Sequence, residues 1–257
     1  MKNSPALIGF NTMARKELVR IFRIWSQTLL PPVVTTTLYF VIFGAFIGSQ
    51  VAPIAGYSYM QFIMPGLIMM TIITSAYMNT VSTFYFTKWQ NTIDELLVSP
   101  MPRWSIIAGY IFGGVARAMI VGVLVLIVSL FFTHLHVANP FIIFAAAFMT
   151  ALLFSLAGLV NGIFAKTFDA ISIVPTFVLT PLTYLGGVFY SVSMLPPIFQ
   201  TISFFNPILY MVNAFRYGFL GISDVSVGLS FAIMGGISVV LLVLSLWLFK
   251  RGVGLKN

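Results

Sequence analysis

The sequence contains no cysteine, only five acidic residues and only two histidines among its 257 residues. The lack of cysteine excludes a disulfide framework, a thiol nucleophile and a cysteine-based metal site. The histidines, His134 and His136, stand two residues apart with no acidic residue nearby, so we expect no metal site there. The phosphate-loop pattern G-x-x-x-x-G-K-[ST] is also missing, so we expect that this chain does not itself bind and hydrolyse ATP. We expect no other cofactor and no catalytic residue in it.

Charge is scarce as well. Charged residues make up 7% of the chain and hydrophobic residues 60%, whereas a soluble domain is about 25% charged. So few charges cannot coat a water-facing surface, and the composition predicts an all-α protein whose partner is the lipid bilayer. We expect one membrane domain over residues 1–257. The net charge of +8 fits basic residues that flank membrane spans, so no nucleic-acid partner is expected.

Six apolar stretches are long enough to cross a bilayer, which takes about 20 residues. They cover roughly 28–48, 60–86, 105–131, 140–165, 171–190 and 227–249. The basic residues gather before the first span, in the loops after the second and fourth spans, and after the sixth. The positive-inside rule then places both termini in the cytoplasm.

The apolar segment 191–224 could be taken for a seventh span. However, Pro196, Pro197 and Pro207 divide it into pieces too short to cross, and Arg216 lies inside it. We expect short helices that re-enter from the outer face. For Arg216 we favour a structural tie between these helices over a gating role.

Residues 10–25 form an amphipathic pattern on a helical wheel. The pattern predicts that residues 1–27 carry a helix lying in the cytoplasmic interface, with its cations towards lipid headgroups; a simple topology anchor is the alternative. One face holds Phe10, Ala14, Leu18, Ile21, Phe22 and Trp25, and the opposite face holds Arg15, Lys16, Arg20 and Arg23.

Residues 87–104 interrupt the apolar pattern. Ser99 and Pro100 end a short helix, because the residue before a proline disfavours the α conformation, and Asp94 and Glu95 lie near its middle. The spacing places four apolar residues on one face of this helix: Trp89, Ile93, Leu96 and Leu97. The prediction is a stiff helix with exposed acids at the cytoplasmic surface, and the alternative is a solvated loop.

The stretch NTIDELLVSPMPRW, residues 91–104, resembles the second cytoplasmic segment of ABC-2-type transporter permeases, in which an acid–x–Leu–Leu–x–Ser–Pro motif occurs. Residues 181–218 resemble the proline-rich block that follows span five of that family: Leu-Pro, then Asn206-Pro207, then Arg216. The likeness covers nearly the whole chain. It is nearest to bacterial permeases of the drug- and nodulation-factor-export type.

The resemblance implies the transmembrane permease subunit of an ATP-binding cassette exporter in a bacterial inner membrane. Two permeases, here a homodimer, would assemble with two separate ATPase subunits that carry ATP and Mg²⁺. The segment from Trp89 to Pro100 would be the coupling helix that docks on the ATPase. The turn with Lys166 and Asp169 would be a second contact, although we favour a solvated turn in which Asp169 caps the next helix.

The resemblance also places spans two and five along the substrate path at the dimer interface. Span two carries Thr71, Ser75 and Asn79 on one side, and span five carries Thr176, Thr180 and Tyr184. Hydrogen bonding between helices is the alternative role. Arg117 in the middle of span three has either a structural or a substrate-contacting role. So uncharged a path suits an amphipathic or neutral substrate.

Other functions fit less well. A secondary transporter or channel working without an ATPase would need acids inside the membrane, and none of the five acids lies in a predicted span. An intramembrane enzyme would need a catalytic set at membrane depth. A non-transporting assembly factor remains open.

Overall fold

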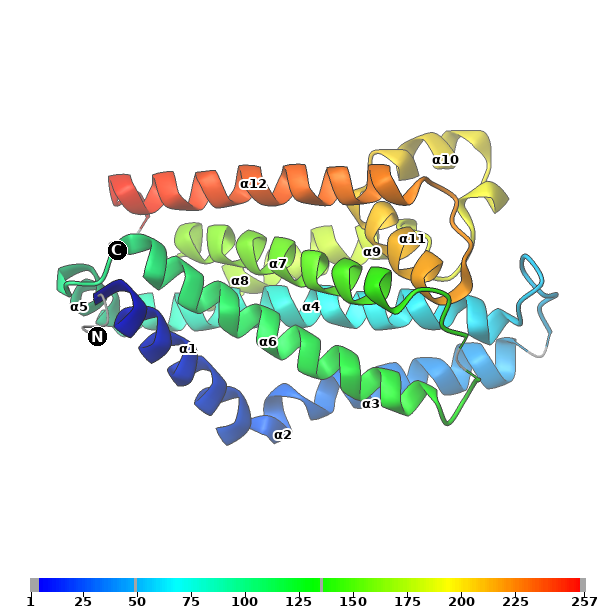
Figure 1. Cartoon of the computed structure of the whole chain (residues 1–257), viewed down its shortest axis with the longest axis horizontal. Coiled ribbons are helices and arrows are strands. Elements are labelled where there is room, and N and C mark those ends of the chain that lie inside the picture. Colours follow the sequence, from blue (N-terminus) through cyan, green and yellow to red (C-terminus); the bar gives the residue numbers. More distant parts are fainter. Residues whose placement is uncertain (1–4, 49, 135, 255–257) are drawn as a thin grey trace.

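A computed structural model of the chain describes residues 5–48, 50–134 and 136–254. This part of the chain forms a bundle of helices and contains no β-strand (Figure 1), which confirms the all-α prediction. The elements are α1 (Pro5–Arg23), α2 (Trp25–Thr28), α3 (Leu30–Tyr39), η1 (Phe40–Ile47), α4 (Tyr59–Trp89), α5 (Thr92–Val98), α6 (Arg103–Ser129), α7 (Pro140–Phe164), α8 (Phe168–Val174), η2 (Pro175–Leu179), α9 (Thr180–Leu185), η3 (Val192–Met194), α10 (Pro197–Phe204), α11 (Pro207–Leu220) and α12 (Val227–Arg251).

Six helical stretches are long and apolar enough to cross a membrane, as predicted. They are Trp25–Gly44, α4, α6, α7, Phe168–Leu185 and α12. The first differs from the predicted 28–48 because α2 continues into α3 and η1. The fifth ends at Leu185 rather than at residue 190, because the chain turns at Gly186 and Gly187, the latter with φ +74°.

Helix α4 lies at the centre of the bundle, and 83% of its apolar 18-residue stretch is buried. It packs against α6, α7, α11 and α3. Small residues permit these approaches: a Cβ on Gly158 of α7 would come within 2.6 Å of the Tyr77 carbonyl of α4. The outer helix α12 and the fifth span remain largely exposed in the single chain, and lipid or a second chain can cover them.

The two ends of the bundle differ. The start of α1, the end of α12 and the short helix α5 lie at one end, which we call the terminal end; α10 and α11 lie at the opposite, distal end (Figure 1). The prediction that 191–224 forms short helices is confirmed. Pro197 and Pro207 open α10 and α11, and the Asn206 side chain caps α11 by accepting a hydrogen bond from Ile208 N at 3.0 Å.

Helix α1 differs from the predicted arrangement in one respect. It packs on α6, with Met13 and Glu17 against Gly109 and Gly113. Arg20, which we expected among the headgroup-facing cations, is instead partly buried beside Glu17. The helical wheel predicts Arg20 on the headgroup-facing side because a wheel uses hydrophobicity alone. It does not include the pairing of Arg20 with a buried acid. Phe22 and Trp25 are exposed, as suits contact with lipid.

Candidate functional site

Helix α5 projects at the terminal end between α4 and α6 (Figure 1). Ile93 anchors it with 2% exposure, while Asp94 and Glu95 are exposed and Val98 is 86% exposed. The predicted end of the helix is confirmed. Ser99 is extended (ψ 154°) and closes the last turn by donating from its backbone N to Glu95 O at 3.1 Å. The surface thus offers two carboxylates beside an apolar side chain.

Trp89 does not share the apolar face predicted with Ile93, Leu96 and Leu97. The helix breaks between α4 and α5, where Asn91 is left-handed with φ 59°, and this break changes the helical phase. Trp89 therefore belongs to the end of α4 and contacts Phe168 of α8 edge-on, with ring centroids 5.7 Å apart.

Lys88 ties three segments together at the root of α5. Its side chain is buried, and Nζ donates hydrogen bonds to the carbonyls of Ile163 (2.8 Å), Ala165 (2.8 Å) and Gly254 (3.0 Å). A lysine ammonium has three donors, and all three are used. A positive charge also suits the carbonyl end of α7. Lys88 is one of the basic residues after the second predicted span that indicate topology, and its position just after an apolar run gives no sign of this burial.

The turn between α7 and α8 lies against the same end of α4. Tyr85 donates to the Lys166 carbonyl at 3.3 Å and contacts Phe168 edge-on at 4.9 Å. The prediction that Asp169 caps α8 is wrong. Thr167 is extended and accepts a hydrogen bond from Ala170 N at 3.2 Å, which leaves Asp169 exposed in the first turn.

The polar residues of span two, Thr71, Ser75 and Asn79, are buried inside the single chain. The Thr71 hydroxyl lies 2.8 Å from the Thr36 hydroxyl of α3, so these two helices are bonded to each other. Ser75 Oγ has no partner among the described residues. A substrate-contacting role for this side of α4 stays a prediction.

Asn79 takes part in a buried polar cluster that the sequence did not suggest. Arg20 Nη2 donates to Glu17 Oε2 at 2.7 Å and to Asn79 Oδ1 at 2.8 Å. Glu17 is 0% exposed and packs against Gly113 of α6. The cluster therefore joins α1, α4 and α6. In the sequence, the signal for this cluster is the acid–base pair of Glu17 and Arg20 three residues apart.

Arg117 of α6 binds the start of the first span. Its Nη2 donates to the Thr28 carbonyl at 2.9 Å, at the point where α2 ends, so it supplies a donor to a helix-end carbonyl that lacks an intrahelical partner. This contact supports the structural role, while its Nε has no partner among the residues described.

The polar residues of span five, Thr176, Thr180 and Tyr184, are exposed in the single chain. Tyr184 stacks with Phe189 at 5.6 Å between ring centroids. Tyr190 donates to the Tyr184 carbonyl at 2.9 Å, and burial raises the pKa of Tyr190 above its ordinary value. These residues are exposed, whereas Thr71, Ser75 and Asn79 are buried within the same chain; contact across a second chain stays a prediction.

Arg216 of α11 is buried at the distal end. Its Nη2 donates to the Gly187 carbonyl at 2.6 Å, its Nε to the Phe62 carbonyl at 3.4 Å, and its guanidinium stacks on the Phe62 ring at 4.0 Å. The residue thus ties α11 to the start of α4 and to the turn after α9.

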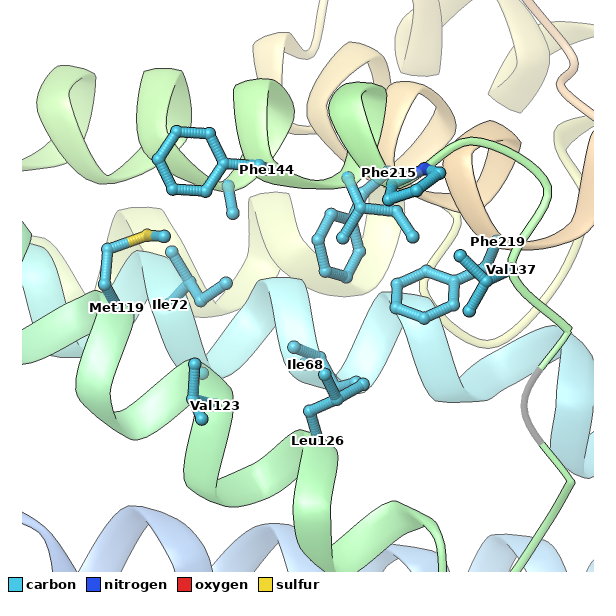
Figure 2. A pocket seen from close by; sticks show the side chains of 13 residues that line it. Ile68, Ile72, Met119, Val123, Leu126, Val137, Phe144, Phe215 and Phe219 are labelled. Atoms are coloured by element: carbon cyan, nitrogen blue, oxygen red, sulfur yellow. The ribbon is translucent and has the colours of Figure 1, made fainter.

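An apolar cavity of about 270 Å³ lies between α4, α6, α7 and α11. Figure 2 shows Met119, Val123 and Leu126 of α6 across from Phe144 of α7, with Ile68 and Ile72 of α4 at its floor. Every residue that lines it is apolar or glycine. Such a cavity strongly disfavours charged ligands, because a charge would lose its hydration without gaining a polar partner.

Comparison with known proteins decides the family. Residues 9–220 match the ABC-2 type transporter family. The chain belongs to the ABC-2 type transporter family. It is 54% identical to the inner membrane transport permease YadH of Escherichia coli K12 over 250 residues, which cover 97% of this chain and 98% of that protein. This ABC-2 protein is therefore a membrane transport permease.

More distant similarity extends to nodulation protein J. The chain is 25% identical to that of Rhizobium leguminosarum bv. viciae over 207 residues, which cover 79% of this chain and 80% of the relative. It is 23% identical to that of Rhizobium meliloti over 246 residues, with 95% and 94% covered.

Proposed function

We propose that this ABC-2 permease is the transmembrane subunit of an ATP-binding cassette exporter and works with a separate ATPase subunit. The observation that carries the proposal is α5, a short helix anchored by Ile93 that presents Asp94, Glu95 and Val98 outward at the terminal end. A short projecting helix with two carboxylates beside an exposed apolar side chain suits docking of a protein partner.

The proposed orientation places the terminal end in the cytoplasm of a bacterial inner membrane, with both chain termini there. Support comes from the basic residues at this end: Arg103, Lys166, Lys250 and Arg251 lie in or beside its helix ends, and cytoplasmic loops carry such an excess. The relative from E. coli is named an inner membrane permease.

The proposed assembly is a homodimer with two ATPases that carry ATP and Mg²⁺. The fifth span supports a second copy, because only 11% of it is buried in one chain and its exposed face carries Thr176, Thr180 and Tyr184. Nucleotide-driven closure of the ATPases would move α5, and α4 and the fifth span would then open the path to the opposite side.

The test is co-purification of the tagged chain with an ATPase that has a phosphate loop and no membrane span, encoded beside it. We expect a stable complex, and we expect the D94K/E95K double variant to lose the partner or its coupling while the permease still folds. The double charge reversal K250E/R251E, at the exposed end of α12, is the matched control. A double variant that stimulates its ATPase normally would contradict the coupling role of α5.

A further inference from the structure

A polar pocket of about 290 Å³ lies at the distal end, between the start of α4, η3, the end of α11 and the loop that leads to α12. Its polar lining residues are Ser191, Ser193, Asn213, Arg216, Ser223 and Asp224. A water molecule occupies about 30 Å³ of liquid, so this pocket has room for a small organic molecule.

Arg216 supplies a positive charge to this pocket. The side chain is 1% exposed, and two of its three nitrogens bind the carbonyls of Phe62 and Gly187. The third, Nη1, has no hydrogen-bond partner among the described residues. A buried charged donor is costly without an acceptor. Nη1 carries two N–H groups, so it can donate to one or two acceptor oxygens.

Asp224 supplies a negative charge at the rim of the same pocket. Its carboxylate accepts hydrogen bonds from Ser191 Oγ at 2.5 Å and Val192 N at 3.3 Å, and its backbone N donates to Asn213 Oδ1 at 2.8 Å. These bonds hold the carboxylate in place, and its other lone pairs can accept further donors. Asp224 and Arg216 form no ion pair in the described part of the chain.

The remaining walls are apolar: Ile54, Phe62, Met194 and Ile222. A ligand therefore meets a cation at the floor, an anion at the rim and hydrocarbon between them. A dianion such as phosphate is disfavoured by the rim carboxylate, and a simple anion leaves the rim without a partner.

We propose that this pocket binds a small molecule that carries one carboxylate and a neighbouring hydrogen-bond donor, either an ammonium or a hydroxyl group. One carboxylate oxygen accepts from Arg216 Nη1, and the donor group binds Asp224. Amino acids and hydroxy acids share this chemistry. The site lies apart from α5 and needs no ATPase, so its test and that of the proposed function have separate outcomes.

Three probes with one carbon skeleton test the proposal: L-alanine, L-lactate and propionate, which differ only in the group beside the carboxylate. The measurement is the thermal unfolding midpoint of the purified chain in detergent as each probe is raised through millimolar concentrations. We expect alanine, lactate or both to raise the midpoint in a saturable manner, and propionate to act more weakly. The responding probe tells an ammonium from a hydroxyl donor.

Variants at the pocket entrance keep the test independent of Arg216, whose loss threatens folding. S193W fills the pocket from an exposed position and should abolish the shift. T201W on exposed α10 is the control for an added tryptophan. D224N should reduce the difference between the midpoint shift with alanine or lactate and the shift with propionate. No shift with any probe, an equal shift with propionate, or an unchanged shift in S193W would overturn the proposal.

Discussion

Arg20 of α1 donates to Asn79 of α4 across 2.8 Å, and the same nitrogen pairs with Glu17 at 2.7 Å. A helix expected to lie free at the membrane surface is thereby bonded to the central helix of the bundle. One guanidinium group thus bonds α1 to α4.

The first prediction concerns this guanidinium. R20M leaves the Glu17 carboxylate buried without its partner, and removing one member of a buried pair costs about 3–5 kcal/mol. We expect R20M to lower the free energy of unfolding by about 3 kcal/mol in a dodecyl sulfate titration, and the double variant E17Q/R20M to lower it by less. R23M, at an exposed position of the same helix, should be neutral. Equal losses for R20M and R23M would show that the cluster contributes nothing.

The second prediction concerns Lys88, whose three hydrogen bonds hold the α7–α8 turn and the segment at Gly254 against the end of α4. K88M removes these bonds. Helix α5, which follows the end of α4, and the α7–α8 turn should then move relative to each other. Since the chain has no cysteine, spin labels at E95C and D169C report their separation directly. We expect a broader distance distribution in K88M than in K166M, its matched control. Identical distance distributions in K88M and K166M would show that the Lys88 hydrogen bonds do not hold these segments together.

The third prediction compares two glycines. A Cβ on Gly158 meets the Tyr77 carbonyl at 2.6 Å, whereas one on Gly236 of α12 meets nothing within 4 Å. G158A should destabilise the chain by about 1–3 kcal/mol through overpacking. G236A should be neutral or stabilise by up to about 1 kcal/mol through helix propensity. Thermal unfolding of both variants in detergent checks the signs; the same sign for both would refute the role of close packing.

The fourth prediction places the fifth span at the interface between two copies. T180C on its exposed face should cross-link two chains with a short thiol-specific reagent in membranes, because so little of this span is buried in one chain. V240C, on the equally accessible α12 (65% exposed), should not. Cross-linking from position 240 but not from position 180 would place the interface elsewhere.

Sequence reasoning identified what depends on long, regular patterns. Six apolar runs set the spans, and Pro197 and Pro207 correctly marked the short distal helices, because length and proline chemistry act locally. The end of α5 at Ser99 followed from Pro100 for the same reason.

The parts that sequence missed depend on contacts between distant segments. Lys88 is buried against carbonyls that lie 75 to 166 residues away in the sequence. Arg20 points inward because it donates hydrogen bonds to Glu17 and Asn79. Trp89 fell out of phase because a single left-handed residue, Asn91, breaks the helix. Capping of α8 by Thr167 rather than Asp169 was a shift of two residues that backbone conformation alone decides.

The most direct test of the central claim, that α5 meets a separate ATPase, is photo-cross-linking from Val98. This residue is 86% exposed at the terminal end, and Phe131, after α6 at the other end, is 84% exposed. With a photoreactive phenylalanine at either position, the account predicts that position 98 cross-links to the ATPase in the purified complex and that position 131 does not. A complex that forms without any cross-link from position 98, or with equal cross-linking from position 131, would contradict it.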